Sequence, residues 1–158
     1  MVDRKVLGYT QVIQPGRPTQ VVKGPDGRDE TICTTWKGMP QDIRVSPDGK
    51  TWYIADMMSN GVYVVDGERF AQIDYVKTST GAHGLYPSRD GRKLYIANRG
   101  SNKIHAPPKG PGGVSVLDFA TRKIVAEWPI PGGGSPDMGN VSADGKQLWL
   151  SGRYDDAV

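Results

Sequence analysis

Three polar residues recur at one place relative to a repeated turn, and their types could bind a charged group. Gln41, His83 and Asp137 each lie five residues before a serine, in the segments MPQD, GAHG and SPDM. A histidine and a carboxylate that converge can bind a cation, an anionic ligand through protonated histidine, or a charged residue of a partner. Alternatively, each side chain only hydrogen-bonds the backbone of a neighbouring loop. We hypothesise a ligand site at these three residues.

A second set of matching positions adds two positive charges. Arg99 and Arg153 occupy equivalent places, where the first copy of the repeat has Met57. A guanidinium group is a planar fork that can bind a carboxylate or phosphate through two hydrogen bonds. Arginines are also common on protein surfaces without any ligand, so the alternative is that both side chains are only exposed to solvent. We include Arg99 and Arg153 in the predicted ligand site.

Other chemistries lack the residues that they need. Two histidines, His83 and His105, and the single Cys33 are too few for a zinc site. The segment DGKT at 48–51 resembles the end of a phosphate-binding loop, but Arg44 stands where the first glycine belongs. The sequence has no Ser-x-x-Lys pair and no Gly-x-Ser-x-Gly elbow. We therefore predict no catalytic residue, metal or cofactor, which favours a non-enzymatic protein without settling that question.

These positions are equivalent because the chain contains an internal repeat. The segment SPDGK at 46–50 recurs as SRDGR at 88–92 and as SADGK at 142–146. An alternating segment follows each copy, at 51–56, 93–98 and 147–152. Two copies continue into further strand-like segments, at 61–66 and 69–76 and at 113–118 and 123–130. The spacings are 42 and 54 residues, and an insertion at 103–112 with a loop two residues longer accounts for the difference.

The repeat predicts an all-β fold. Asp-Gly between alternating apolar segments is a strong hairpin signal, because glycine adopts positive φ at little cost. Each unit of about 40 residues therefore forms a four-stranded antiparallel meander, which cannot bury both of its faces alone and must stack on a copy of itself. Four-stranded units of this period are typical of a β-propeller. The 21 glycines and 12 prolines also exclude a long-helix protein.

The repeat divides the chain into two complete blades and two incomplete ones. We predict one partial propeller over 1–158, with an incomplete blade at 4–38, full blades at 39–80 and 81–134, and the start of a further blade at 135–158. In the incomplete blade we expect strands at 6–13, 19–24 and 30–37. Such a half-ring would expose unpaired strand edges. We expect a fragment, so that missing blades close the ring, with closure by a second chain as the alternative.

Several segments resemble the YVTN β-propeller repeat family of YncE-like proteins. They are YIANRGSN at 95–102 followed by GGVSVLD, ADMMSNGVYVVD at 55–66, and GAHGLYPSRDGRKLYIAN at 81–98. The resemblance implies a seven-bladed ring, export to the periplasm or cell surface, and a role in binding or scaffolding. Related propellers belong to redox enzymes, so it also implies an alternative. In that reading the chain is part of a periplasmic enzyme similar to amine-dehydrogenase or haem-d1 propellers, with His83 in a cofactor pocket.

Charge and hydrophobicity limit the classes of partner that we expect for this protein. A net charge of +3 is mild, so weak nucleic-acid binding through this charge and exposed aromatics such as Tyr154 is a second alternative. No apolar run approaches the ~20 residues of a membrane-spanning helix, and no signal peptide is visible at the N-terminus. Our leading hypothesis is a binding or scaffold module that presents channel-mouth loops to a protein or small ligand.

Overall fold

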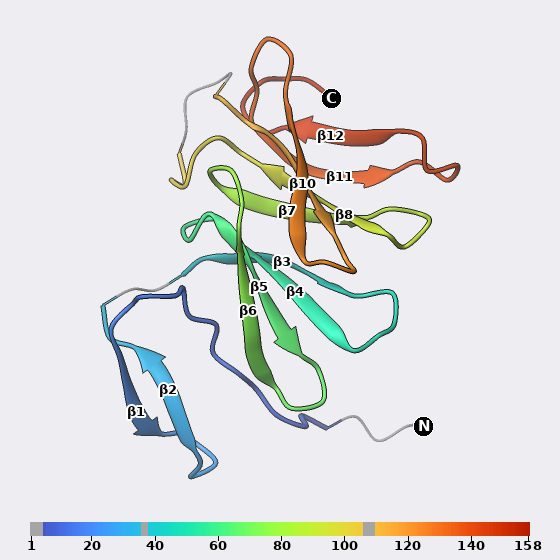
Figure 1. Ribbon diagram of the computed structural model, residues 1–158. Helices are drawn as coiled ribbons and strands as arrows, with labels where there is room; N and C mark the ends of the chain where they lie inside the picture. Colours follow the sequence, from blue (N-terminus) through green and yellow to red (C-terminus); the bar gives the residue numbers. More distant parts are fainter. Residues whose placement is uncertain (1–4, 36–37, 106–109) are drawn as a thin grey trace.

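A computed structural model describes residues 5–35, 38–105 and 110–158, and these residues contain strands but no helix (Figure 1). Two four-stranded antiparallel sheets form the centre, and each is a simple meander in chain order. The first contains β3 (Pro40–Val45), β4 (Thr51–Asp56), β5 (Gly61–Asp66) and β6 (Ala71–Lys77). The second contains β7 (Ala82–Pro87), β8 (Lys93–Asn98), β9 (Gly113–Asp118) and β10 (Lys123–Pro129). Two hairpins flank them, β1 (Thr19–Lys23) with β2 (Asp29–Cys33), and β11 (Pro136–Val141) with β12 (Leu148–Gly152).

The repeated turn has the same hydrogen bonds in all three copies. In the first copy, Ser46 Oγ donates to Asp48 Oδ1 at 2.5 Å, and the same oxygen accepts the Lys50 N–H at 3.1 Å. Gly49 completes the turn with a φ of 76°, in the left-handed region that glycine adopts readily. The copies at 88–92 and 142–146 repeat these contacts. The turns join β3 to β4, β7 to β8 and β11 to β12, which confirms the predicted hairpins.

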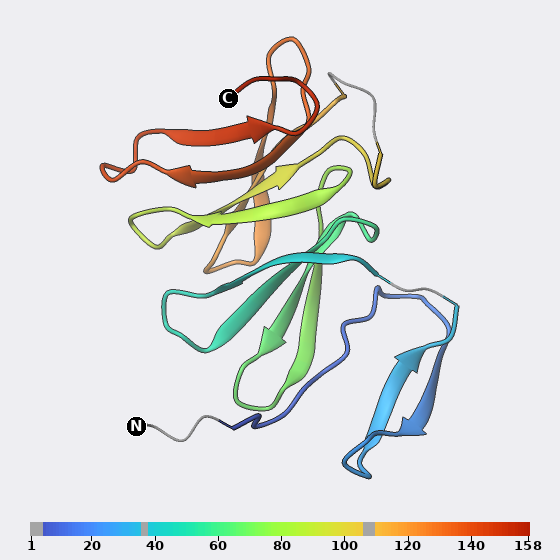
Figure 2. The same cartoon turned by 180° about the vertical axis from the view of Figure 1, so that it is seen from behind.

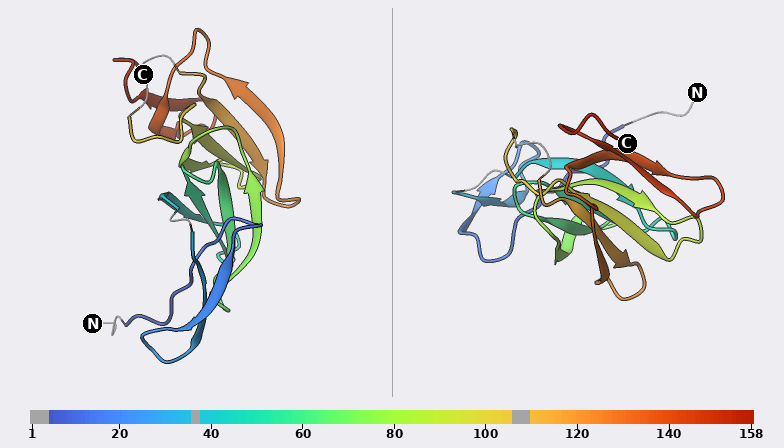
Figure 3. Two further views of the ribbon diagram at one scale, coloured as in Figure 1. Left: turned by 90° about the vertical axis from the view of Figure 1, so that its left-hand side faces the viewer. Right: turned by 90° about the horizontal axis from the view of Figure 1, so that it is seen from above.

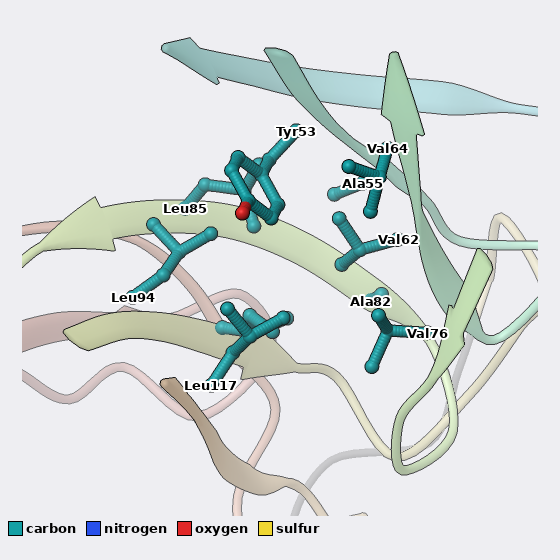
Figure 4. Close-up of a cluster of buried hydrophobic side chains, with 10 residues drawn as sticks. Tyr53, Ala55, Val62, Val64, Val76, Ala82, Leu85, Leu94 and Leu117 are labelled. Carbon is teal, nitrogen blue, oxygen red and sulfur yellow. The ribbon is translucent and has the colours of Figure 1, made fainter. Parts of the chain in front are cut away.

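The two central sheets stack face to face over an apolar core (Figure 4). Tyr53, Val62 and Val64 of the first sheet face Leu85 and Leu117 of the second, and each of these side chains is at most 1% exposed. Burial of such side chains stabilises the fold by about 1.5–3 kcal/mol each. Stacked sheets that twist against one another follow an arc, which Figure 3 shows. The all-β propeller architecture predicted from the repeat is therefore confirmed.

A second interface joins the sheet β7–β10 to the hairpin β11–β12 (Figure 2). Tyr86 and Ala97 pack there against Val141, with Leu148 and Leu150 at the margin. Polar contacts reinforce the same interface. Arg89 donates to the carbonyl oxygens of residues 141 and 142, at 2.5 and 3.0 Å, and the Tyr86 hydroxyl donates to the carbonyl oxygen of residue 137 at 3.2 Å. Each successive unit is thus tied to the one before it.

One predicted strand is not formed. The segment 6–13 has no strand assignment, although it lies beside β6. The backbone N–H and C=O of Ile13 bond instead to the side-chain amide of Gln72, at 2.7 and 3.0 Å. At Ile13, this side chain therefore takes the place of the backbone bonds of a strand ladder. Residues 36–37 of the predicted strand 30–37, and 106–109 of the insertion, lie outside the described residues.

Candidate ligand site at the channel mouth

The predicted site residues lie at irregularities in three equivalent strands. β7 lies between β3 and β11, so the first strands of successive units are neighbours, as expected of the strands that line a propeller channel. The register of each strand breaks near its start, between Pro40 and Asp42, between Ala82 and Leu85, and between Pro136 and Gly139. Gln41, His83 and Asp137 fall within these breaks. Bulges of this kind redirect a side chain out of the regular alternation.

His83 and Asp137 form a buried pair across two blades. His83 Nδ1 lies 2.7 Å from Asp137 Oδ1, and both side chains are only 10% exposed. Burial raises the pKa of Asp137. The hydrogen bond and charge of His83, together with the charges of Arg99 and Arg153, lower this pKa by more than burial raises it. The net effect is a pKa below the usual value for aspartate. Asp137 is therefore a carboxylate at neutral pH.

Gln41 does not join this pair. Its side chain is exposed, and its amide donates to the carbonyl oxygen of Met39 at 3.1 Å. This contact matches the alternative in which the side chain bonds only to neighbouring loop backbone. Gln41 therefore lies at the equivalent strand position without a described contact to His83 or Asp137.

The two arginines connect to the same cluster through a tyrosine. Arg153 Nη1 donates to Asp137 Oδ2 at 3.2 Å, and Arg153 Nε donates to the Tyr154 hydroxyl at 3.1 Å. Arg99 Nη2 donates to the same hydroxyl at 3.1 Å. The Cζ atoms of both arginines lie 5.6 Å from the centre of the Tyr154 ring. His83 and Asp137 of the first predicted set and Arg99 and Arg153 of the second therefore form one continuous cluster, which does not include Gln41.

Sequence reasoning missed three members of this cluster. Tyr154 was considered only as an exposed aromatic, but it is partly buried and its hydroxyl donates to the Ile104 carbonyl oxygen at 2.5 Å. Met57 places its sulfur 2.8 Å from Arg99 Nη1. Met57 shares its repeat position with Arg99, which was a usable signal. The carbonyl of Ile104 had no such signal, because it belongs to the insertion.

The far end of the insertion is fixed beside the cluster. The N–H of Gly134 donates to the Gly110 carbonyl at 2.8 Å, and the N–H of Gly112 donates to the Gly134 carbonyl at 3.0 Å. A Cβ atom on Gly112 would lie 2.4 Å from both that carbonyl oxygen and a ring carbon of Pro136, so only glycine fits. The insertion is thereby anchored next to the start of β11, the strand that carries Asp137.

The charges of the cluster favour an anionic ligand. Arg99 and Arg153 carry two positive charges, and Asp137 carries one negative charge. The two arginine charges therefore outnumber the single carboxylate charge. Among the described residues, no group of three or more His, Cys, Asp or Glu side chains could hold a metal ion. No described helix is long and apolar enough to cross a membrane.

Comparison with known proteins identifies the fold family. A model of the YNCE-like β-propeller family matches residues 28–158. The hydrazine synthase of Kuenenia stuttgartiensis is similar in structure, with 25% identity and a TM-score of 0.61 over 79% of this chain and 33% of that one. A candidate 6-phosphogluconolactonase from Bacteroides uniformis has 21% identity and a TM-score of 0.58, over 85% of this chain and 40% of that one.

A third similar structure is the dihydro-heme d1 dehydrogenase NirN in complex with DHE. It has 16% identity and a TM-score of 0.55, over 92% of this chain and 34% of that one. The chain thus spans 33% to 40% of the length of these three structures. No curated protein matches the sequence significantly.

Proposed function

Because the chain belongs to the YNCE-like β-propeller family, we propose that it acts as a non-enzymatic binding module whose channel mouth binds a charged group of a protein or small ligand. The observation that carries this proposal is the convergence of His83, Asp137, Arg99 and Arg153 from two blades into one cluster. Polar groups that converge at the mouth of a β-propeller or barrel are typical of ligand sites.

The rest of the proposal concerns the setting of this site. We propose that further blades, or a second chain, complete the ring around the channel. We also propose that the protein works in the periplasm or outside the cell, as the family resemblance implies, and that binding needs no cofactor. A protein partner and a small ligand would use the same charged cluster.

A ligand panel with a mouth variant tests the proposal. The triple variant Gln41→Ala, His83→Ala, Asp137→Ala removes polar groups from all three equivalent strands. The panel contains small carboxylates, phosphates, amines and sugars, each tested by thermal unfolding. A ligand present at a hundredfold excess over its Kd stabilises the folded state by about 2.7 kcal/mol, which raises the Tm of a domain of this size by roughly 5 °C or more. We expect at least one class to stabilise the wild type and not the variant.

The control variant changes the opposite end of the same blades. Lys50→Ala, Arg92→Ala, Lys146→Ala removes exposed charges from the three repeated hairpins and leaves the mouth unchanged. Asp137 is buried, so its substitution can also destabilise the fold. The single variant Arg153→Ala therefore provides a second test of ligand binding at a more exposed member of the cluster. The proposal fails if ligands stabilise the wild type, the mouth variants and the control equally, or if no class stabilises the wild type.

A redox role is the second candidate, and the geometry of His83 favours it. Asp137 Oδ1 lies 2.7 Å from Nδ1, and no described residue hydrogen-bonds Nε2. A carboxylate on one ring nitrogen makes the other a better ligand for a metal or cofactor. Similar structures include the hydrazine synthase and the dihydro-heme d1 dehydrogenase. An absorption spectrum of the purified protein distinguishes the candidates, since a haem or quinone band that His83→Ala abolishes would support the redox role.

A further inference from the structure

Arg99 is a buried cation that forms no ion pair with any described residue. The residue is 1% exposed, and its Nε has no hydrogen-bond partner among residues 5–35, 38–105 and 110–158. Nη1 faces only the sulfur of Met57, a weak acceptor, and Nη2 contacts the neutral Ile104 carbonyl oxygen at 3.5 Å. Within the described part of the chain, no carboxylate lies within ion-pair distance of Arg99. Buried charges are normally paired, because removal from water is costly unless an opposite charge compensates.

The Tyr154 hydroxyl lies where an anionic oxygen would be expected. It accepts hydrogen bonds from Arg99 Nη2 and Arg153 Nε, both at 3.1 Å, so these two nitrogens are at most about 6 Å apart. Its own proton goes to the Ile104 carbonyl oxygen at 2.5 Å. This neutral oxygen therefore uses both lone pairs on guanidinium donors. Two cations that share one neutral acceptor form the kind of site that a carboxylate would bind more strongly.

We propose that Arg99 and Arg153 form a carboxylate-binding site, and that the Tyr154 hydroxyl occupies it until a ligand displaces it. A carboxylate offers two oxygens to the two guanidinium groups that now share the single Tyr154 oxygen. The ligand is a small carboxylic acid or an acidic side chain of a partner protein, which share this chemistry. The proposal rests on the binding function proposed above and specifies the ligand class for that same site.

If a ligand must displace the Tyr154 hydroxyl, removal of that hydroxyl should strengthen binding, which charge attraction alone does not predict. Tyr154→Phe removes the competing hydroxyl and keeps the ring beside both guanidinium groups. We expect the variant to bind acetate about tenfold more tightly, because a hydrogen bond to a charged group no longer has to be broken. Arg153→Gln is expected to weaken acetate binding by about tenfold or more, since one arm of the site is lost. Arg153 is more exposed than Arg99, so this variant is less disruptive to the core.

Binding is measured by titration with sodium acetate at constant ionic strength, following the Nε–H resonances of arginine in ¹⁵N-labelled protein. Sodium chloride and sodium phosphate are the comparison salts. The capped peptide acetyl-Gly-Glu-Gly-amide represents an acidic side chain of a protein and distinguishes that source from a free acid. Tyr9→Phe and Arg92→Gln are the matched controls, since both residues lie away from the mouth, and both are expected to leave acetate affinity unchanged.

The outcomes separate this inference from the function on which it rests. Unchanged or weaker acetate binding in Tyr154→Phe overturns the displacement, and unchanged binding in Arg153→Gln overturns the site. If neither acetate nor the peptide shifts any arginine resonance, the carboxylate class is wrong. The binding function would then still stand if another class in the ligand panel depended on the mouth residues, and would fall together with this inference if none did.

Discussion

Asp137 is the residue that connects His83 to the two arginines at the channel mouth. One carboxylate oxygen pairs with His83 and the other with Arg153, so a single side chain links β7 to the end of β12. His83 is the repeat equivalent of Asp137, and Arg153 is the repeat equivalent of Arg99. Counting within the repeat therefore found His83, Asp137, Arg99 and Arg153, because a repeated fold places equivalent positions in neighbouring units at the same end.

The contact between Tyr154 and Ile104 could not be predicted from positions in the repeat. Tyr154 occupies the repeat position of Met58 and Gly100, which gave no signal for a shared tyrosine, and the insertion that contains Ile104 has no equivalent in the other copies. The role of Gln41 was also undetermined from the sequence, because an exposed amide can satisfy itself on local backbone. Position in the repeat predicts which strand end a side chain occupies, whereas its partners depend on loop conformation.

The lowered pKa of Asp137 predicts a pH-dependent contribution to stability. A carboxyl group whose pKa is lower in the folded state stabilises the fold above its usual pKa, and this contribution is lost as the pH falls through the lowered folded value. Asp137→Asn should therefore cost about 2 kcal/mol of unfolding free energy at neutral pH, from the lost charge-assisted contacts. Urea unfolding should show the gap to wild type closing as the pH falls below the usual pKa of aspartate.

The exposed Asp26 provides the comparison for this measurement. Asp26→Asn is expected to change the free energy of unfolding by less than about 0.5 kcal/mol, as is usual for surface substitutions. A gap between wild type and Asp137→Asn that stays constant from neutral to acid pH would contradict the assignment of Asp137 as a stabilising carboxylate.

At the scale of elements, the repeated hairpin sets the strand register that positions the site. Each turn fixes where the first strand of a blade ends, and therefore where its bulge and its polar residue lie. The serine, aspartate and glycine of this turn have fixed roles, which made the hairpins predictable from sequence. The segment 6–13 lacked such a turn, and its place before 19–24 in the repeat template wrongly suggested a strand there.

The turn glycines give a prediction about backbone conformation. Gly49 has a φ of 76° and nothing within 4 Å of a Cβ atom built on it, so Gly49→Ala is strained by its backbone alone. We expect a loss of about 1 kcal/mol in the free energy of unfolding, measured with urea, and a smaller loss for Gly49→Asn, which tolerates this region. Gly91→Ala should cost more, because its Cβ would also meet Pro47 at 3.3 Å. Equal losses for Ala and Asn at position 49 would contradict this explanation.

At the scale of the whole molecule, equivalent aromatic positions show that one face of the hairpin β11–β12 lacks a neighbour. Tyr53, Tyr95 and Trp149 occupy the same place in β4, β8 and β12. Tyr53 is 1% exposed beneath the next sheet, and Tyr95 is partly buried at the next interface, whereas Trp149 is 55% exposed. Among the described strands, β12 pairs only with β11, so its other edge offers unpaired backbone groups. Exposed apolar surface beside an open edge favours association.

We therefore expect the 158-residue chain to self-associate through β12, with a second copy covering Trp149. The meander order of the complete sheets requires a third strand beside β12, and β1 of another copy has a free edge to provide one. Light scattering coupled to gel filtration should show a mass above the monomer that increases with protein concentration. Trp149→Lys should restore the monomer, because a charged side chain at an exposed edge opposes association. Val125→Lys, which changes a 53% exposed side chain on the complete sheet, should not. A wild-type chain that stays monomeric at every concentration, or equal effects of the two lysine variants, would contradict association through this edge.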